Sequence, residues 1–329
     1  MKKLLSVLLA FVMVLCLVGC GGNQANDPSK EAGEDGGKLK IGYTCNNATA
    51  DSNQAIGFQA VIDNCEAAGV EVIALDPAGD ANVQYSQIEN FIEMGVDGIL
   101  FRACDSTTII PALKKAHEAG IPIVCTTNII DESGFDYFDA FCGPSDYNQA
   151  VEVCKSVKAM FEGQEKVNVL QVQHVPGSMV SQLRDEGFWE EAEGSNLVLL
   201  EKQTANGKRE EAQQITENWL LKYDIDDIDV IYVEGDGMLH GVTAAMEAAG
   251  VTGDDIKVFG ICVSAETYDK IEAGLVAGSC LQSPYDDAKL AVETVIKLIN
   301  GDTNVEFLNY MPNPAVTKES LDEIDRPDW

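Results

Sequence analysis

The sequence predicts an α/β protein with two doubly wound parallel sheets in tandem. After residue 38, short apolar runs alternate with single amphipathic segments, which is the pattern of right-handed βαβ units. The first helical segments each end at a glycine (Gly69, Gly95 and Gly120), a residue that readily takes the left-handed conformation in which helices stop. Even without its N-terminal segment, the 329-residue chain is longer than one hydrophobic core usually supports.

The first series of elements begins at residue 39. The apolar runs LKIGYT, VEVIAL, GILF and IPIVCTT predict strands at 39–44, 70–75, 98–101 and 121–127. The amphipathic segments between them predict helices at 53–68, 82–94 and 108–119.

A second series follows the segment 138–144. Further apolar runs predict strands at 167–173, 197–203, 229–235, 256–262 and 278–283, and an extended segment at 304–310. The helices of this series are expected at 146–161, 180–192, 208–222, 239–249, 265–273 and 285–300.

The first twenty residues predict an export signal and not a fold element. Lys2 and Lys3 precede an apolar run at 4–18, which is shorter than the ~20 residues of a membrane-spanning helix, the alternative interpretation. The closing sequence LVGC resembles a bacterial lipobox, which implies a signal peptide at 1–19 and a lipid on Cys20. Residues 20–37 are polar and glycine-rich, so we expect a flexible tether to the membrane.

Charge and motif content exclude several classes of function. The chain has 22 basic and 54 acidic residues and a formal net charge of −32, so neither nucleic acid nor an anionic membrane surface is expected as a partner. The acid pairs at 226–227 and 254–255 lack calcium-loop spacing, and no dinucleotide fingerprint follows the first strand. No motif ties a nucleophile to His174. We therefore expect no cofactor and no catalytic centre.

Eight of the ten cysteines follow Cys20 and form neither a CxxC pair nor a cluster with histidine, so no metal site is expected. Several, such as Cys125 and Cys142, stand in apolar runs where a thiol behaves as a small buried hydrophobe. Either some of these cysteines pair, or the protein comes from a reducing environment. The sequence leaves both open.

Ligands of doubly wound sheets lie outside the carboxyl ends of the strands, so the residues after each strand indicate the chemistry of the site. These residues are rich in amides, hydroxyls and carboxylates and include an arginine, which suits a small polar molecule. They are 44–47, 102–105, 126–128, 173–174, 204–206, 234–236, 262–264 and Gln282.

Several stretches, in this order and spacing, carry a resemblance to a family. They are KLKIGYTCNNA, GVDGILFRACDS, AGIPIVCTTN, QHVPGSMVSQLRDEGF, VIYVEGDGMLHGVTAAMEAAG, IKVFGICVSAETYDKIEAG and LQSPYDDAKLAVE. From residue 39 to about 316, the chain resembles the type I periplasmic solute-binding proteins, in the ribose-binding-like branch that serves sugar ABC transporters.

The resemblance implies two lobes joined by three crossing strands near 142–144, 282–283 and 309–310, with hinge closure on a ligand between them. It implies an N-terminal lobe of 38–142 plus 283–309 and a C-terminal lobe of 143–282 plus 310–329. A monomeric, extracytoplasmic binding protein would deliver a sugar or sugar derivative to a membrane permease with its ATPase. A sensor that docks on a chemoreceptor or sensor kinase, and an exported enzyme, are the alternatives.

The ligand-binding candidates combine positions that match the family's motif with Arg102, Asp105 and Asn206, which are chosen because they follow strands. They are Asn46, Asn47, Asp51, Ser52, Arg102, Asp105, Thr127, Asn128, Gln182, Arg184, Asn206, Asp236, Cys262 and Gln282.

The chain departs from the family at several of these positions. No aromatic residue follows Asn46 and Asn47, so a stacking ring would come from elsewhere, for instance from Phe135 or Tyr137. Thr127-Asn128 stands where the family often has Asp-Arg, Gln182 where it has arginine, Gly235 where it has asparagine, and Cys262 where it has aspartate. Asp236 and Gln282 match.

Arg102 leaves the third strand and is the most informative of the candidates. It could pair with a carboxylate or phosphate of the ligand, or form a structural ion pair with Asp105 or Asp51.

Overall fold

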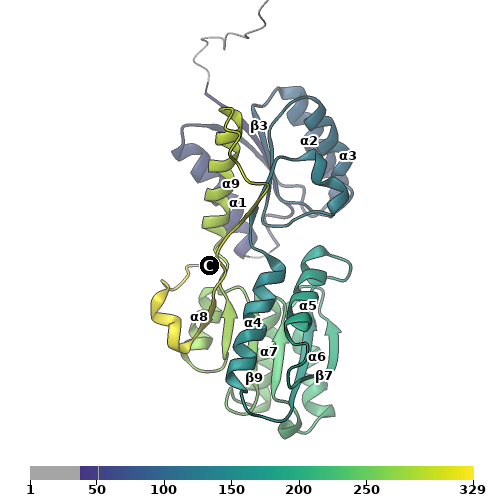
Figure 1. The fold of residues 1–329 in the computed structure, drawn as a ribbon, viewed down its shortest axis with the longest axis vertical. Coiled ribbons are helices and arrows are strands. Elements are labelled where there is room, and N and C mark those ends of the chain that lie inside the picture. The colour runs from purple at the N-terminus through teal and green to yellow at the C-terminus, as the bar shows by residue number, and fades with distance from the viewer. Residues whose placement is uncertain (1–37, 51) are drawn as a thin grey trace, which may run out of the picture. The chain divides into compact units, whose positions relative to one another are not determined.

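The computed structural model describes residues 38–50 and 52–329 (Figure 1). The expectations for the signal peptide, the tether, Cys20 and Asp51 lie outside these residues, as does the side chain of Ser52. In the part of the chain that the structure describes, no helix combines the length and apolar character of a membrane span.

The N-terminal lobe contains a six-stranded parallel sheet in the order β11-β5-β4-β3-β1-β2. Its strands are β1 (Lys40–Thr44), β2 (Glu71–Leu75), β3 (Gly98–Phe101), β4 (Ile123–Thr126), β5 (Ala140–Gly143) and β11 (Leu308–Tyr310). Along β3, Leu100 belongs to one hydrophobic core whereas Ile99 and Phe101 belong to another. This alternation shows that both faces of the sheet are buried, as expected for a doubly wound sheet.

Four helices cover the two faces of this sheet. They are α1 (Ser52–Ala67), α2 (Ala81–Met94), α3 (Ile110–Glu118) and α9 (Pro284–Ile299). Helices α1 and α9 pack together over the face that contains Leu100, and α2 and α3 cover the opposite face. Asp80 caps α2 by accepting hydrogen bonds from two backbone amides of the first turn, and Gly95 ends that helix in the left-handed conformation.

The C-terminal lobe contains a second six-stranded sheet in the order β12-β10-β9-β8-β6-β7. Its strands are β6 (Val167–Gln173), β7 (Leu197–Thr204), β8 (Val230–Val233), β9 (Lys257–Ile261), β10 (Gly278–Cys280) and β12 (Ala315–Thr317). Helices α4 (Asp146–Met160) and α5 (Met179–Glu191) cover one face, and α6 (Arg209–Lys222), α7 (Asp236–Ala249) and α8 (Ala265–Glu272) cover the other. The prediction of two doubly wound sheets is confirmed.

The chain passes between the sheets three times: between β5 and α4, between β10 and α9, and between β11 and β12 (Figure 1). Ser145 and Ser283 cap the helices that follow the first two passages, each by accepting a hydrogen bond from a backbone amide of the helix. Helix α9 therefore belongs to the N-terminal lobe although it follows β10 of the other lobe.

Two helix starts differ from those expected, and one strand was missed. Helix α7 begins at Asp236, three residues earlier than expected, because Gly237 lies in the first turn, where the backbone amides need no intrahelical partner. Helix α3 begins at Ile110 and not at 108, with Pro111 in its first turn. The extended segment at 304–310 contributes only three residues to a strand, and β12, which pairs antiparallel with β10, was not expected.

The thiols of Cys45, Cys65, Cys104, Cys125, Cys142, Cys154 and Cys280 are free. For these cysteines, the structure therefore favours the unpaired alternative that the sequence left open.

Candidate functional site

A cavity of about 630 Å³ lies at the carboxyl ends of both sheets. We call it the cleft. The N-terminal lobe contributes residues that follow β1, β3 and β4, and the C-terminal lobe contributes residues that follow β6, β7, β8 and β9. Its volume lies in the range of sites for small molecules.

Most of the sequence-predicted site residues line the cleft. They are Asn46, Arg102, Thr127, Asn128, Arg184, Asn206, Asp236, Cys262 and Gln282.

Three predicted residues are not part of the cleft wall. Asn47 accepts hydrogen bonds from the amide and hydroxyl of Thr49 within its own turn. Asp105 accepts from the amides of Thr107 and Thr108, and these bonds lower the pKa of its carboxyl to about 2. Gln182 is exposed on α5.

The two aromatic residues considered for stacking also lie elsewhere. Phe135 packs against Phe138 and Phe307, and Tyr137 contacts the ring of His117.

Backbone strain is concentrated at the cleft. Among the described residues, positive φ angles at residues other than glycine occur at Ala78, Thr127, Asn206 and Cys262, and the last three line the cleft. Thr127, with φ 65°, is β-branched, for which this conformation is especially costly. Such strain persists where the surrounding structure fixes it and is common at binding sites.

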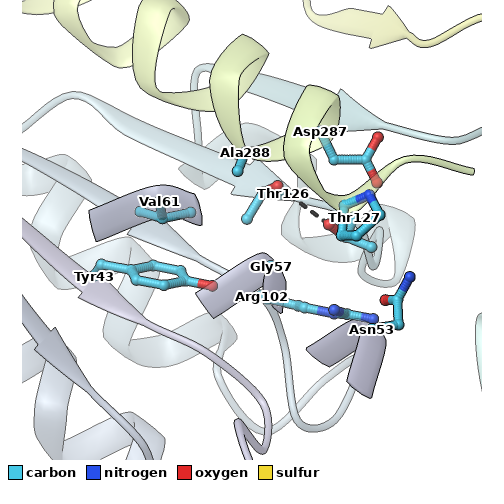
Figure 2. A pocket seen from close by; sticks show the side chains of 10 residues that line it. Tyr43, Asn53, Gly57, Val61, Arg102, Thr126, Thr127, Asp287 and Ala288 are labelled. Atoms are coloured by element: carbon cyan, nitrogen blue, oxygen red, sulfur yellow. Dashed lines mark hydrogen bonds between the residues drawn. The ribbon is translucent and has the colours of Figure 1, made fainter. Parts of the chain in front are cut away.

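Arg102 reaches from the end of β3 towards Asn53 of α1 (Figure 2). Its Nε atom donates a hydrogen bond of 3.3 Å to Asn128 Oδ1. Within residues 38–50 and 52–329, no carboxylate lies within 4.0 Å of its guanidinium nitrogens, so the expected alternative of an ion pair with Asp105 is wrong. Among the described residues, the guanidinium is therefore held by one amide, and it lines the cleft and a small neighbouring hollow.

Asp287 of α9 lines that hollow and is 2% exposed (Figure 2). Its Oδ2 atom accepts a hydrogen bond of 3.1 Å from Gln282 Nε2. Burial raises the pKa of its carboxyl to about 7, although the Arg102 charge partly opposes this rise.

Two amide groups offer unused hydrogen-bonding atoms to the cleft. Asn46 Oδ1 and Asn53 Nδ2 are buried, and neither has a hydrogen-bond partner among the residues that the structure describes. Because buried polar atoms are nearly always paired, this acceptor and this donor are suited to a bound molecule or to water.

The guanidinium of Arg184 forms a buried ion pair and is not free to bind a ligand. Its Nη2 atom lies 2.8 Å from Asp146 Oδ1 and 3.2 Å from Gln149 Oε1, and Nη1 donates to the backbone carbonyl of Glu234. Gln149 Nε2 in turn lies 3.5 Å from Gln282 Oε1. Arg184 thus joins α5, α4 and the end of β8 in the wall of the cleft, and most of its donors are used by the protein.

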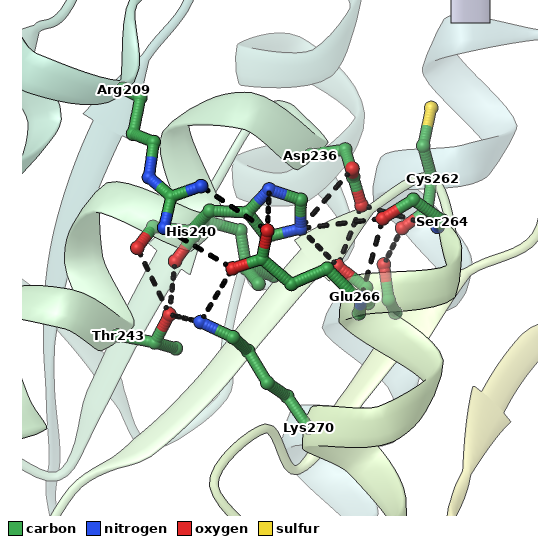
Figure 3. Close-up of polar contacts among 11 residues, drawn as sticks. Arg209, Asp236, His240, Thr243, Cys262, Ser264, Glu266 and Lys270 are labelled. Atoms are coloured by element: carbon green, nitrogen blue, oxygen red, sulfur yellow. Dashed lines mark hydrogen bonds and ion pairs between the residues drawn. The ribbon is translucent and has the colours of Figure 1, made fainter. Parts of the chain in front are cut away.

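Asp236 is oriented by a network around His240 (Figure 3). Asp236 Oδ1 accepts a hydrogen bond of 2.6 Å from the Thr267 hydroxyl, and Oδ2 lies 3.3 Å from His240 Nε2. His240 Nδ1 lies 3.3 Å from Glu266 Oε2, which also faces Arg209. Burial lowers the pKa of His240, against the opposing effect of the two carboxylates.

Comparison with known proteins assigns the chain to a family. A family model described as "Periplasmic binding protein domain" matches residues 30–303.

The chain belongs to this periplasmic binding protein family.

Similar proteins of known name are binding proteins as well. The ribose import binding protein of Bacillus subtilis is 28% identical over 233 residues, which cover 71% of this chain and 73% of that protein. The fructose import binding protein of Bifidobacterium longum is 24% identical over 333 residues, 99% of this chain and 98% of that protein.

A similar solved structure is also that of a solute binding protein. An ABC transporter solute binding protein from Bacillus halodurans, with bound myo-inositol, is 25% identical and has a TM-score of 0.80, covering 88% of this chain and 98% of that one. The predicted resemblance to type I periplasmic binding proteins is confirmed, and the family is one of binding proteins rather than enzymes.

Some cleft residues of this periplasmic binding protein were missed by sequence reasoning. Asn53 lies within a helix and His240 within α7, so neither directly follows a strand, and Trp329 belongs to the polar tail. The signal available for Asn53 and His240 was their position in the first or second turn of a helix that begins at the cleft. In the described residues, no group of three or more His, Cys, Asp or Glu side chains could hold a metal ion.

Proposed function

We propose that this chain is the extracytoplasmic solute-binding component of an ABC importer and captures a sugar or sugar derivative in the cleft without chemical turnover. The observation that carries the proposal is the cleft itself, with polar side chains from both lobes and three strained residues at strand ends. The relatives named as ribose and fructose import binding proteins support the ligand class.

The proposed contacts follow from the donors and acceptors in the cleft. Arg102 supplies a guanidinium, Asn46 and Asn53 supply an acceptor and a donor, and Asp236 supplies an oriented carboxylate. The vicinal hydroxyl groups of a sugar both donate and accept hydrogen bonds, so they match a cleft that offers both donors and acceptors. Gln282, which is bonded to Asp287, lies at the second passage between the lobes.

We also propose that the lobes close on the ligand as two bodies. Their boundaries would be 38–142 plus 283–309 and 143–282 plus 310–329, with the hinge at the three passages between the sheets. The C-terminal helix α9 would move with the first body because it packs on α1.

The same proposal includes the membrane partners. Export by the signal at 1–19 and lipid on Cys20 would anchor a monomer beside a permease and its ATPase. Cys20→Ser is expected to release the protein from the membrane fraction. Retention of that variant in washed membranes would contradict the anchor but not the binding function.

A ligand panel tests binding. The panel contains D-ribose, D-allose, D-fructose, xylitol, myo-inositol and D-galacturonate, and the readouts are thermal shift and calorimetric titration of the purified protein. We expect one or more compounds to bind stoichiometrically, to raise the unfolding temperature and to remain chemically unchanged. Turnover of a bound compound would favour an enzyme, and absence of binding across the panel would overturn the sugar class.

Arg102→Ala tests the site. Loss of charge-assisted hydrogen bonds is expected to weaken the panel compound that binds by about tenfold or more. The matched control is Lys115→Ala, which removes a cation of the same lobe that is paired with Glu89 on the surface. Unchanged affinity in Arg102→Ala would remove this residue from the site.

A further inference from the structure

Trp329 is the single aromatic residue among the described residues that line the cleft. The loop after β1 offers Ala48, Thr49 and Ala50, and the rings of Phe135 and Tyr137 are packed elsewhere. A sugar or cyclitol ring has an apolar C–H face as well as hydroxyl groups, and an indole is the side chain best suited to cover such a face.

The segment 324–329 is fixed on the C-terminal lobe by specific contacts. Arg326 Nε and Nη2 lie 2.6 and 2.7 Å from the two carboxylate oxygens of Asp269 on α8, a bidentate pair. The backbone amide of Ala265, the first residue of α8, donates a hydrogen bond of 2.6 Å to the carbonyl of Trp329. These contacts fix the position of Trp329 at the cleft.

The same segment also touches the N-terminal lobe. Tyr285 of α9 has its ring centre 5.7 Å from that of Trp329 in an edge-to-face arrangement, and its hydroxyl donates to Asp328 Oδ1 at 3.3 Å. Trp329 is therefore in contact with residues of both lobes, at a point where they meet around the cleft.

We propose that Trp329 is a ligand-contacting residue of the cleft that packs on the apolar face of a ring-shaped sugar or cyclitol. This inference rests on the proposed function. Arg102, Asn46 and Asp236 would bond to the hydroxyl groups while the indole covers the C–H face. The cleft would then favour ring-shaped compounds over open-chain polyols, which lack a fixed apolar face.

The test compares Trp329→Ala and Trp329→Phe with the wild type by calorimetric titration against D-ribose, D-allose, myo-inositol and xylitol. For the ring compounds that bind, we expect Trp329→Ala to raise Kd about tenfold and Trp329→Phe to raise it less than about threefold. For the open-chain xylitol, we expect a change of less than about threefold in both variants.

Tryptophan fluorescence gives a second readout, because the emission reports on the surroundings of the indole. Ring compounds are expected to alter the emission of the wild type, and the change should be lost in Trp329→Phe although that variant still binds. The control is Trp219→Phe, which removes a tryptophan from the core of the C-terminal lobe and should retain both the affinity and the fluorescence change.

The outcomes separate the two proposals. If no panel compound binds the wild type, the proposed function and this inference both fail. If a ring compound binds Trp329→Ala as tightly as the wild type, or the fluorescence change persists in Trp329→Phe, the inference fails and the proposed function stands. If Trp329→Ala does not fold, as judged by circular dichroism, the Trp329→Phe fluorescence result decides.

Discussion

Asp287 is a carboxyl group enclosed beside the cleft, where Arg102, Asp286 and Asp146 are its charged neighbours. Burial raises its pKa from the ordinary value of 3.8 to about 7. The folded protein therefore holds this proton more tightly than the unfolded chain does. Its contribution to stability is fully present below pH ~4 and is lost as the pH rises to about 7.

Asp287→Asn replaces the titrating carboxyl, so the loss of stability with rising pH should disappear. The asparagine oxygen still offers an acceptor to Gln282. We expect the free energy of unfolding of the variant, relative to the wild type, to increase between pH ~4 and ~7 by at most about 4 kcal/mol and then to stay level. Urea unfolding at a series of pH values measures this difference. A difference that does not change with pH would show that the wild-type carboxyl titrates normally.

Individual site residues could be predicted where the strand-end rule applies. Arg102, Asn128 and Asp236 lie within three residues of the end of a strand, and all three line the cleft. The role of Arg184 could not be predicted, because its partner Asp146 is 38 positions away and meets it only when α4 and α5 pack. Trp329 could not be predicted either, since tertiary contacts alone bring the tail to the cleft.

Helices α6 and α7 approach each other closely at Gly241. A Cβ atom on this residue would lie 2.1 Å from the carbonyl oxygen of Arg209 and 2.9 Å from the amide nitrogen of Gln213, so backbone would have to move. We expect Gly241→Ala to lower the free energy of unfolding by about 1–3 kcal/mol, as measured by urea unfolding.

Gly57→Ala is the control for this substitution. It lies within α1, and its nearest contact would be an ordinary 3.6 Å from Pro284 Cβ, so alanine should stabilise the helix by about 0.5–1 kcal/mol. Equal effects of the two substitutions would contradict the close approach of α6 and α7.

The elements themselves were largely readable from the sequence, because buried parallel strands are continuous apolar runs and helices end at glycines. The errors occurred where local signals conflict. Gly237 suggests a break but lies in the first turn of α7, and β12 is only three residues long and pairs at an edge. Short edge strands carry little apolar periodicity, so the sequence pattern does not reveal them.

Across the part of the molecule that the structure describes, most of the free thiols are buried. Burial raises the pKa of Cys65 and Cys142 to about 11 and that of Cys45 and Cys154 to about 12. A thiol with such a pKa is almost entirely protonated near neutral pH and reacts slowly.

We therefore expect little reaction of these thiols with a disulfide reagent in the native protein. In denaturant, the number of reactive thiols should be the same with and without prior reduction, and a reductant should leave the unfolding temperature unchanged. A count of reactive thiols that rises after reduction would reveal a disulfide. So would an unfolding temperature that falls when a reductant is added.

Helix α9 and strand β11 belong to the N-terminal lobe but follow the sheet of the other lobe in the sequence. This order affects how the chain can fold while it is being synthesised. A ribosome completes β1 to β5 first, then the sheet of the other lobe up to β10, and only afterwards the helix that covers the face around Leu100. Strand β5 also lacks its partner β11 until that stage, since Phe141 pairs with Leu308. Such distant pairings form slowly. Neither half of the gene encodes a complete lobe, so the emerging chain keeps an uncovered apolar face until nearly all of it has been made.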